Sequence, residues 1–473
     1  MNNKLYFYGG LDTVGGVHVI YQHGNVGLLF DAGIAHKGLF RAPFIHLNDR
    51  LQPTKGLELE QYLLNKMAPP IQELYDESAT THITQEDLLA LWEKDHFPAF
   101  EKMYVFISHM HQDHMALLPF FRENVTVYMH ELSYATYQAM VEANYYMDTK
   151  ATIVTFHTNE TIELDGFSLQ TMEVDHNILG TSGFLLHSNE GKIAFTADWR
   201  MHGHHQQKMQ QFISTCQEAS VDILLTETTK VTPNSAEKAS EAKAESTVLE
   251  QFEELIAQQK GLTYLLALPL DVERMINMIL IADRQEKILI LDQQIAHFWR
   301  QIRKEEALFK AIDDFSAVED RVIRVLSHQS TSTKSSSYRQ VGIKEIVHDK
   351  QRYIFHLTFT SIPLFIQMER LGEKGNASIF IHANCPADQQ LLQTWLTAFN
   401  IRYHNISNAG HATHQDIIDL TEQINPKVII PIHGNQPHML KSNKENVYLP
   451  TYGEEVVIRE LIQGEEKQAN EIY

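Results

Sequence analysis

The segment MYVFISHMHQDH, residues 103–114, places metal-binding side chains directly after an apolar strand. The strand covers 104–107, and the loop behind it holds His109, His111, Asp113 and His114. Side chains this close together at the end of one strand can point at a single spot. Imidazole and carboxylate ligands together suit zinc, and also manganese. A polar loop that holds these residues by chance is the weaker interpretation, because the pattern is so dense.

Candidates for further ligands occur at other strand ends. His176 follows FSLQTMEVD, Asp198 follows KIAFTA, and His433 follows KVIIPI. A single histidine at a strand end is more often structural or on the surface. The same placement repeated along one chain argues against coincidence, so we expect these side chains to join the first cluster.

The composition limits the classes of protein to which the chain can belong. The chain has 473 residues, enough for about two or three domains, and 43% of them are hydrophobic. It contains no long apolar run, and the N-terminus MNNKLYFYGG lacks the pattern of a signal peptide, so we expect no membrane span. With only two cysteines, Cys216 and Cys385, a reducing cytoplasm is the expected compartment. The net charge of −21 counts against a surface that coats nucleic acid, but not against a local cleft.

The pattern of strands and helices predicts an α/β protein with an insertion. The N-terminal part consists mainly of strands, except for a helical insertion over 36–102. That insertion has expected helices near 57–67 and 71–77, and a third that follows a capping box at Thr84 and Asp87. From 229 to 399 strands alternate with helices, which indicates a parallel sheet in a second domain. Residues 400–473 return to the first pattern and complete the first domain.

These motifs resemble those of the metallo-β-lactamase superfamily: HxHxDH, a lone His, an Asp after a strand and a C-terminal strand followed by His. The opening Gly-Gly and FDAG, with Asp31, also fit. VDILLTETT ending near Glu227, NAGHAT with His411, and IPIHGNQPHM with His438 are similar to the motifs of the β-CASP branch, in its ribonuclease J-like form. The resemblance implies a metallo-β-lactamase αββα sandwich (1–228 and 400–473) with an inserted α/β β-CASP domain (229–399).

The resemblance also implies roles for individual residues. Asp198 would bridge two metal ions, zinc or manganese, and a hydroxide shared by the metals would attack the substrate. The remaining ligands would divide into His109, His111 and His176 for one ion, and Asp113, His114 and His433 for the other. Asp113 would take part in catalysis as well, and Asp31 would orient the ligand loop rather than bind metal.

The leaving oxygen needs a proton, and His411 held by Glu227 is the candidate general acid. The alternative is that His411 only packs in the turn after Gly410. Gly410, His411 and His438 are the candidates for binding a phosphate oxygen. The chain departs from the family where Ala197 replaces a glycine in TADWR. Arg200 in the same motif is expected to form an exposed ion pair.

Three functions remain open at this point. The first is a ribonuclease or phosphodiesterase acting on single-stranded RNA, with exonuclease and endonuclease cleavage not distinguished. The second is a hydrolase of a small ester, lactone or phosphoester, with 36–102 as a lid, which the net charge of −21 favours slightly. The third is a binding protein without catalysis, against which the full ligand set argues. The sequence stops soon after its last strand, so we expect no separate dimerisation domain, although a homodimer stays open.

Overall fold

The computed structural model describes residues 2–35, 53–233, 242–310, 312, 314–327, 338–358, 363–371, 377–383, 389–408, 410–440 and 446–464. The chain forms two compact units. Unit 1 comprises Met1–Tyr134, Met147–Glu241 and His411–Tyr473, and unit 2 comprises Ala135–Tyr146 and Ala242–Gly410. The inserted unit therefore differs from the predicted 229–399. It begins later because hydrogen bonds from Thr228 to Ile432 and from Thr229 to His433 hold this part of the chain in unit 1.

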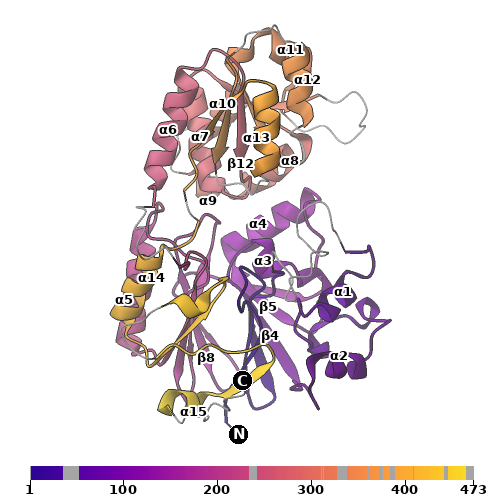
Figure 1. Ribbon diagram of the computed structural model, residues 1–473, viewed down its shortest axis with the longest axis vertical. Coiled ribbons are helices and arrows are strands. Elements are labelled where there is room, and N and C mark those ends of the chain that lie inside the picture. The colour runs from indigo at the N-terminus through magenta and orange to yellow at the C-terminus, as the bar shows by residue number, and fades with distance from the viewer. Residues whose placement is uncertain are drawn as a thin grey trace. The chain divides into compact units, whose positions relative to one another are not determined.

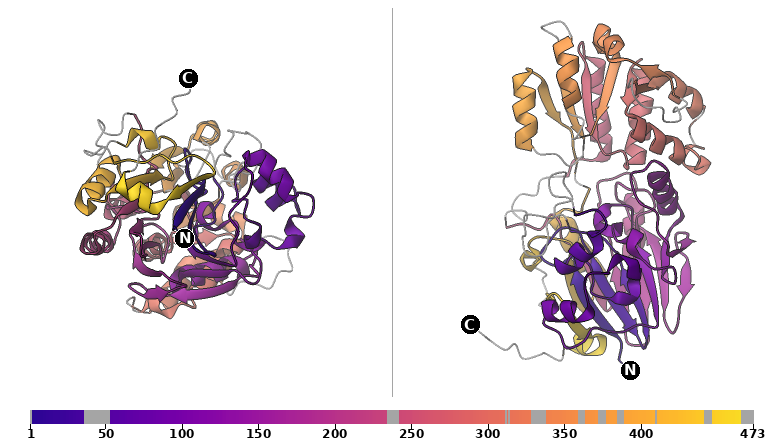
Figure 2. Two further views of the ribbon diagram at one scale, coloured as in Figure 1. Left: turned by 90° about the horizontal axis from the view of Figure 1, so that it is seen from below. Right: turned by 90° about the vertical axis from the view of Figure 1, so that its right-hand side faces the viewer.

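Unit 1 contains two sheets. The first has the strand order β20-β1-β2-β3-β4-β5-β6 and the second has the order β19-β11-β10-β9-β8-β7. The strands of the first sheet are β1 (Lys4–Gly9), β2 (His18–His23), β3 (Val26–Phe30), β4 (Lys102–Ile107), β5 (Thr126–His130), β6 (Thr152–Phe156) and β20 (Glu454–Val457). Those of the second are β7 (Thr161–Glu163), β8 (Ser168–Glu173), β9 (Ser182–His187), β10 (Lys192–Phe195), β11 (Ile223–Glu227) and β19 (Val428–Ile432). β1 and β20, from opposite ends of the chain, pair antiparallel (Figure 2).

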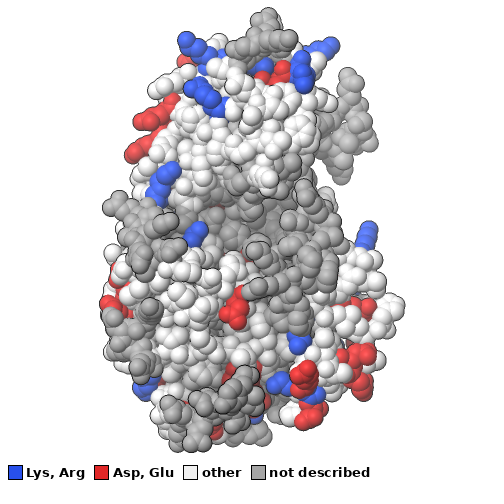
Figure 3. Space-filling model, in the orientation of Figure 1, with Lys and Arg blue, Asp and Glu red and all other residues white. Residues whose placement is uncertain are grey.

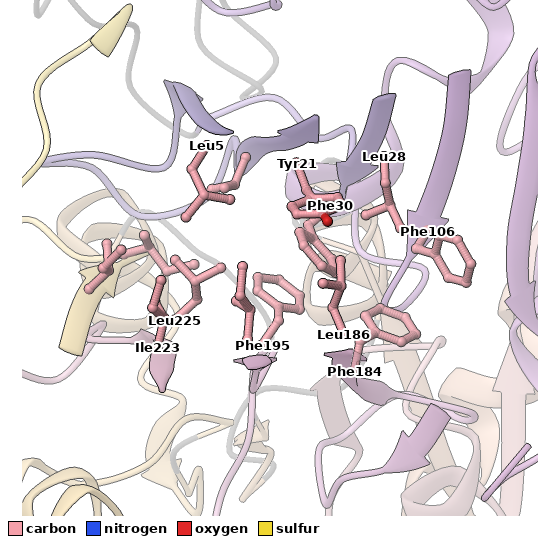
Figure 4. Packing of buried hydrophobic residues seen from close by; sticks show 14 of the residues in the cluster. Leu5, Tyr21, Leu28, Phe30, Phe106, Phe184, Leu186, Phe195, Ile223 and Leu225 are labelled. Atoms are coloured by element: carbon pink, nitrogen blue, oxygen red, sulfur yellow. The ribbon is translucent and has the colours of Figure 1, made fainter. Parts of the chain in front are cut away.

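The two sheets of unit 1 pack face to face through alternate residues of their strands. Because side chains alternate across a strand, Phe30 and Phe106 of the first sheet and Phe195 of the second share one buried cluster (Figure 4). On β10 the intervening Ala194 joins the cluster on the opposite face of its sheet. The centroids of the Phe30 and Phe195 rings lie 5.1 Å apart. Because both faces of these strands are covered, they are nearly continuous apolar runs in the sequence.

Helices cover the outer faces of both sheets in unit 1 (Figure 1). Phe212 of α5 (Gln206–Ala219) and Leu420 of α14 (His414–Ile424) are buried in the cluster outside the second sheet. Outside the first sheet, Trp92 of α2 (Gln85–Trp92) packs edge-on against Tyr8, with ring centroids 5.4 Å apart. The other helices of this unit are α1 (Glu58–Leu64), α3 (Gln112–Met115), the start of α4 (Glu131–Glu142) and α15 (Ile458–Gln463). The predicted αββα sandwich is thus observed.

The predicted helical insertion is only partly helical. The capping box of α2 is confirmed, because the Thr84 side chain accepts from the Asp87 N–H and the Asp87 carboxylate accepts from the Thr84 N–H. The prediction of a helix over 71–77 was wrong: two short 3-10 turns, Gln72–Leu74 and Glu77–Ala79, occupy this region. The Asp76 side chain accepts hydrogen bonds from the N–H and the hydroxyl of Ser78, and such local side-chain bonds compete with a continuous helix. Residues 36–52 of the insertion lie outside the described residues.

Unit 2 is a parallel α/β sheet, as the alternation of strands and helices predicted. Its strand order is β15-β14-β13-β16-β12-β17-β18, and all six pairs of neighbouring strands are parallel. The strands are β12 (Thr263–Ala267), β13 (Ile288–Leu291), β14 (Ile323–Leu326), β15 (Gln340–Val341), β16 (Tyr353–Leu357), β17 (Ile379–Ala383) and β18 (Arg402–Asn405). The helices are α6 (Glu245–Ala257), α7 (Val272–Arg284), α8 (Gln293–Ile302), α9 (Glu306–Phe309), α10 (Phe315–Val322), α11 (Ile343–His348), α12 (Pro363–Leu371) and α13 (Gln389–Ala398).

The direction of the strands in unit 1 positions the candidate site. β3 and β4 run parallel to each other in the first sheet, and β10, β11 and β19 run parallel in the second. Asp31, Asp198 and His433 each follow the carboxyl end of one of these strands, and Glu227 is the last residue of β11. Residues far apart in the sequence therefore meet at one edge of the sandwich. None of the described helices combines the length and apolar character that crossing a membrane requires.

Candidate metal centre

The HxHxDH motif forms a tight loop between β4 and the short helix α3. His109 is fully buried directly after the strand, and His111 precedes the first turn of α3, which contains Asp113 and His114. The helical turn brings Asp113 and His114 back beside His109, so that the rings of His109 and His114 lie 4.0 Å apart between centroids. One short segment thereby contributes to two neighbouring groups of ligand atoms.

The first group combines His109, His111, His176 and Asp198. Nδ1 of His111 lies 3.0 Å from Nε2 of His109 and 3.3 Å from Nε2 of His176. Oδ2 of Asp198 lies 3.8 Å from Nε2 of His109. His176 comes from the loop after β8 and Asp198 from the loop after β10, which is the convergence expected from the sequence.

The second group combines Asp113, His114 and His433, again beside Asp198. Nε2 of His433 lies 3.1 Å from Nε2 of His114 and 3.2 Å from Oδ2 of Asp113. Oδ2 of Asp198 lies 3.2 Å from Nε2 of His114, and Oδ1 of Asp198 lies 3.6 Å from Nε2 of His433. Asp198 therefore touches both groups.

The outward nitrogens of two histidines are held by neighbours. Oδ2 of Asp31 lies 2.7 Å from Nδ1 of His114, and the same carboxylate accepts hydrogen bonds from the backbone and hydroxyl of Ser108. Oγ1 of Thr229 lies 2.8 Å from Nδ1 of His433. Such contacts fix the tautomer and direct Nε2 inward. Asp31 was proposed as an orienting residue, whereas no motif in the sequence singled out Ser108 or Thr229.

Three loop residues of the site adopt left-handed backbone conformations that residues other than glycine rarely take. The φ angles are 57° at Asp31, 54° at Ala197 and 54° at His433. The conformation at Ala197 explains why glycine is the family's usual residue there. Gly33 is required for a different reason: a Cβ atom at this position would overlap the backbone carbonyl of Asp113. At each of these turns the chain leaves its strand in a direction that places a side chain in the cluster.

Glu227 and His411 form a pair beside the two groups. Oε2 of Glu227 lies 3.1 Å from Nδ1 of His411, which in turn lies 3.6 Å from Oδ2 of Asp198. Burial lowers the pKa of His411, but the carboxylates of Glu227 and Asp198 outweigh it and raise this pKa to about 9. His411 keeps 21% of its side chain exposed, and His111 is also half-buried, whereas the other ligand candidates are buried. The site is therefore open to solvent on the side of these two histidines.

The electrostatics of the cluster fit divalent cations. Burial, with the neighbouring histidines, holds the pKa of His109 and His176 well below the usual range, so both imidazoles are neutral, as metal ligation requires. Oδ1 of Asp198 is buried and has no hydrogen-bond partner among the described residues, which is costly unless a cation compensates. Ring nitrogens of neighbouring histidines, such as His109 with His111 and His114 with His433, lie within hydrogen-bond distance of each other. As metal ligands, these nitrogens would each present a lone pair. Neutral imidazoles with carboxylates are the donor set that zinc and manganese prefer.

Not every candidate joins the cluster. His438 lies exposed in the 3-10 turn Pro437–Met439, and among the described residues no hydrogen bond or ion pair links it to the cluster. Gly410 is half-buried next to His411. The expectation of an exposed Arg200 was wrong, because its side chain is 2% exposed and its Nε lies 3.6 Å from Oδ1 of the buried Asp175. In the TADWR loop the backbone N–H of Arg200 donates to the backbone carbonyl of Asp175, and this places the arginine side chain in the interior.

Two sequence families match the chain over the segments that build this centre. One is described as "Beta-lactamase superfamily domain" and matches residues 98–263, which include six of the seven ligand candidates. The other is described as "Zn-dependent metallo-hydrolase RNA specificity domain" and matches residues 397–445, which include His411 and His433. Over these two segments the chain is similar to proteins of the metallo-β-lactamase superfamily. Similarity to this family implies divalent metal ions, and the His and Asp cluster is a group of side chains that could hold them.

Individual relatives agree with this similarity. The chain is 23% identical to Ribonuclease J of Mycoplasma genitalium over 345 residues, covering 70% of this chain and 57% of the relative. It is 22% identical to Ribonuclease J of Mycoplasma pneumoniae, covering 71% and 58%. The chain thus spans less than two thirds of the length of either relative. A crystal structure of a protein of unknown function from Enterococcus faecalis V583 superposes with a TM-score of 0.74 at 18% identity, covering 97% of this chain and 100% of that one. This similarity confirms the predicted fold.

The charge of the surface bears on substrate recognition. On the face shown in Figure 3, Lys and Arg residues are scattered among Asp and Glu residues, and the described residues form no continuous basic band. This agrees with the net charge of −21. An anionic substrate would therefore be attracted by local groups, such as cations held in the cluster, rather than by the general field of the surface.

Proposed function

We propose that this protein is a metal-dependent ribonuclease that hydrolyses phosphodiester bonds of single-stranded RNA. The observation that carries the proposal is the sharing of Asp198 between two ligand groups, with the Glu227–His411 pair directly beside it. The match to an RNA specificity domain and the similarity to two proteins named Ribonuclease J support RNA as the substrate class. The reducing cytoplasm inferred from the cysteine content is part of the same proposal.

The proposal includes two divalent cations, zinc or manganese. His109, His111 and His176 would hold one, Asp113, His114 and His433 the other, and Asp198 both. When bound, such a pair supplies an activated water molecule and an electrophile that stabilises negative charge on the phosphoryl oxygens. The contacts of Asp31 with His114 and of Thr229 with His433 would keep the ligating nitrogens directed inward.

His411 is proposed as the group that protonates the leaving oxygen. Its Nδ1 faces Glu227, so its Nε2 is the atom that would meet the substrate. The carboxylates of Glu227 and Asp198 favour the protonated imidazole, which is the form that can donate a proton. Its partial exposure gives a substrate access to it. Gly410, which directly precedes it, is proposed to contact a phosphate oxygen through its backbone.

The test is hydrolysis of a labelled single-stranded RNA by the full chain loaded with zinc or manganese. We expect His111→Ala to abolish cleavage because it removes a ligand, and metal analysis should show a reduced metal content. His204→Ala is the matched control, since His204 is exposed and lies outside the cluster. The proposal fails if the fully loaded wild-type protein cleaves no RNA.

A hydrolase of a small ester, lactone or phosphoester is the second candidate, favoured by the net charge of −21. An acidic surface repels a long polyanion more strongly than a small neutral substrate. Turnover of a chromogenic lactone or phosphodiester that excess RNA does not inhibit would favour this alternative. Inhibition of that turnover by RNA would instead support the ribonuclease.

A further inference from the structure

The loop after β8, residues 174–181, carries His176 and is closed at its base. The N–H of Val174 donates to the carbonyl of Thr181 at 2.9 Å. This bond joins the two ends of the loop, whereas His176 lies between them. The contacts of Asp175, which directly precedes His176, therefore bear on where the imidazole lies.

Asp175 attaches this loop to the loop after β10, residues 196–205, which carries Asp198. The backbone carbonyl of Asp175 accepts a hydrogen bond from the N–H of Arg200 at 2.8 Å, and its Oδ2 accepts one from the N–H of His205 at 2.9 Å. Its Oδ1 lies 3.6 Å from Nε of Arg200. The two loops therefore meet through both the backbone and the carboxylate of a single residue.

The ion pair of Asp175 and Arg200 is buried and closely packed. The two side chains are 0% and 2% exposed. A Cβ atom at Gly203 would overlap both carboxylate oxygens of Asp175 and Nε of Arg200, so the backbone of the second loop closes directly over the pair. Breaking a buried ion pair leaves an uncompensated charge, which is strongly destabilising. Asp175 is thus held firmly in one position, next to His176.

The loop that carries Asp198 is also held without Asp175. The N–H of Trp199 donates to Oε1 of Glu227 at 3.1 Å, and Glu227 is the last residue of β11. This bond should keep the Asp198 loop in place when Asp175 is changed. The loop of His176 is then the one that moves.

We propose that Asp175 is a positioning residue for His176, and that it thereby determines how tightly the first ligand group binds its cation. Consecutive Cα atoms lie about 3.8 Å apart, so a displaced Asp175 displaces His176 with it. His176 belongs to the first ligand group and not to the second, which comprises Asp113, His114 and His433. A change at Asp175 should therefore weaken the binding of one cation selectively. This inference rests on the metal centre of the proposed function, but not on its substrate.

The first test is a Zn²⁺ titration of the full chain in competition with a chromophoric chelator. Asp175→Ala removes the acceptor for the His205 N–H and the charge partner of Arg200. We expect the Kd of one cation to rise roughly tenfold to a hundredfold, the usual effect of removing a residue that orients a metal ligand from behind. The Kd of the other cation should be unchanged.

Asp222→Ala is the matched control. The carboxylate of Asp222 likewise accepts a backbone N–H, from Lys192, and pairs with a cation, the ammonium group of Lys427. Asp222 directly precedes β11, whereas Glu227, beside the metal centre, ends this strand. The control variant should therefore bind both cations with wild-type affinity.

The second test moves Asp175 without changing any charge or ligand. Gly203→Ala places a Cβ atom against the carboxylate of Asp175, and we expect the same selective loss of affinity for one cation. In a His176→Ala background, Gly203→Ala should cause no further loss, because its effect is exerted through His176. Losses that add in the double variant would reveal a general effect on the unit and would contradict the positioning role.

The outcomes separate this inference from the proposed function. Wild-type affinity for both cations in Asp175→Ala would overturn the positioning role, and so would an equal weakening of both. A wild-type chain that binds no Zn²⁺ would overturn it as well. The titration needs no RNA, so a chain that shows the selective loss but whose wild type cleaves no RNA would refute only the ribonuclease.

Discussion

Glu227 contacts His411 with one carboxylate oxygen and holds the surrounding backbone with the other. Oε2 lies 3.1 Å from Nδ1 of His411, whereas Oε1 accepts hydrogen bonds from the N–H groups of Trp199 and Ala412. Glu227 is therefore bound to the chain segments on both sides of the imidazole. Its charge and its backbone contacts can be tested separately, because glutamine preserves the acceptor oxygen but not the charge.

Glu227→Gln should lower kcat on RNA about a hundredfold, the usual contribution of a positioned proton donor. The amide keeps an acceptor for the two N–H groups, so the fold and the metal content should be unchanged. Steady-state kinetics with metal analysis measures both. Glu218→Gln, on the exposed face of α5, is the control and should behave as wild type. An unimpaired Glu227→Gln variant would contradict the role of His411 as the acid.

Gly33→Ala should destabilise unit 1 by about 3 kcal/mol or more and weaken metal binding, because the added Cβ would overlap the carbonyl of Asp113. The loop that carries Asp113 and His114 must move to accept it. Thermal unfolding and metal titration measure the two effects. Gly342→Ala is the matched control, since its Cβ meets no atom within 4 Å. Equal metal affinity in both variants would show that the loop tolerates the displacement.

Removing the metals should destabilise unit 1 selectively. Asp198, Asp113 and Asp31 gather around His114, and without cations their mutual repulsion is only partly compensated by this imidazole. A ligand that binds only the folded state contributes about 4 kcal/mol at a thousandfold excess over its Kd. Hydrogen exchange after chelation should therefore accelerate in β4 and β10 and not in β12. Acceleration confined to β12 would place the metals elsewhere.

His18 predicts how the metal-free protein responds to acid. Its ring is buried with Nε2 2.8 Å from the carbonyl of Gly33, and burial lowers the pKa of His18 to about 4. The unfolded chain, with a pKa near 6.5, binds more protons between these values, so stability is complete above pH ~6.5 and is lost as the pH falls toward ~4. The loss from this residue is about 3 kcal/mol.

The check for His18 is the free energy of unfolding of metal-free wild type and of His18→Gln, measured between pH 7 and pH 4. Glutamine retains a donor for the Gly33 carbonyl but does not titrate. We expect the stability difference between the two proteins to shrink as the pH is lowered. Only the wild type loses the part of its stability that depends on a neutral His18. A constant difference across the range would show that His18 does not titrate differently on unfolding.

Local patterns in the sequence predicted which side chains converge in the cluster. The motif His109–His114 is contained in one loop, and each remaining ligand follows an apolar strand, so the parallel direction of the strands is enough to bring them together. The capping box at Thr84 is also purely local. Such features need no knowledge of tertiary contacts, which is why they can be read from the residues.

Features that depend on partners distant in the sequence were missed or wrong. From the sequence alone Arg200 resembles a surface residue. Its buried partner Asp175 comes from the loop after β8, which the local sequence around Arg200 does not reveal. Thr229 contacts His433 only because β11 and β19 are adjacent. The boundary of the inserted unit depends on whether residues 229–233 bind to unit 1, and on Asn408 joining Arg274, neither of which leaves a local signal.

The pairing of β1 with β20 and the place of His433 on the chain have a consequence for biosynthesis. A ribosome releases the first cluster, with His109 and Asp198, long before it releases His433 and the strand Glu454–Val457 that completes the first sheet. Unit 2 is complete by Gly410 and can fold while the earlier part of unit 1 still waits. A nascent or prematurely terminated polypeptide therefore lacks His433, so the full ligand cluster can assemble only late in synthesis.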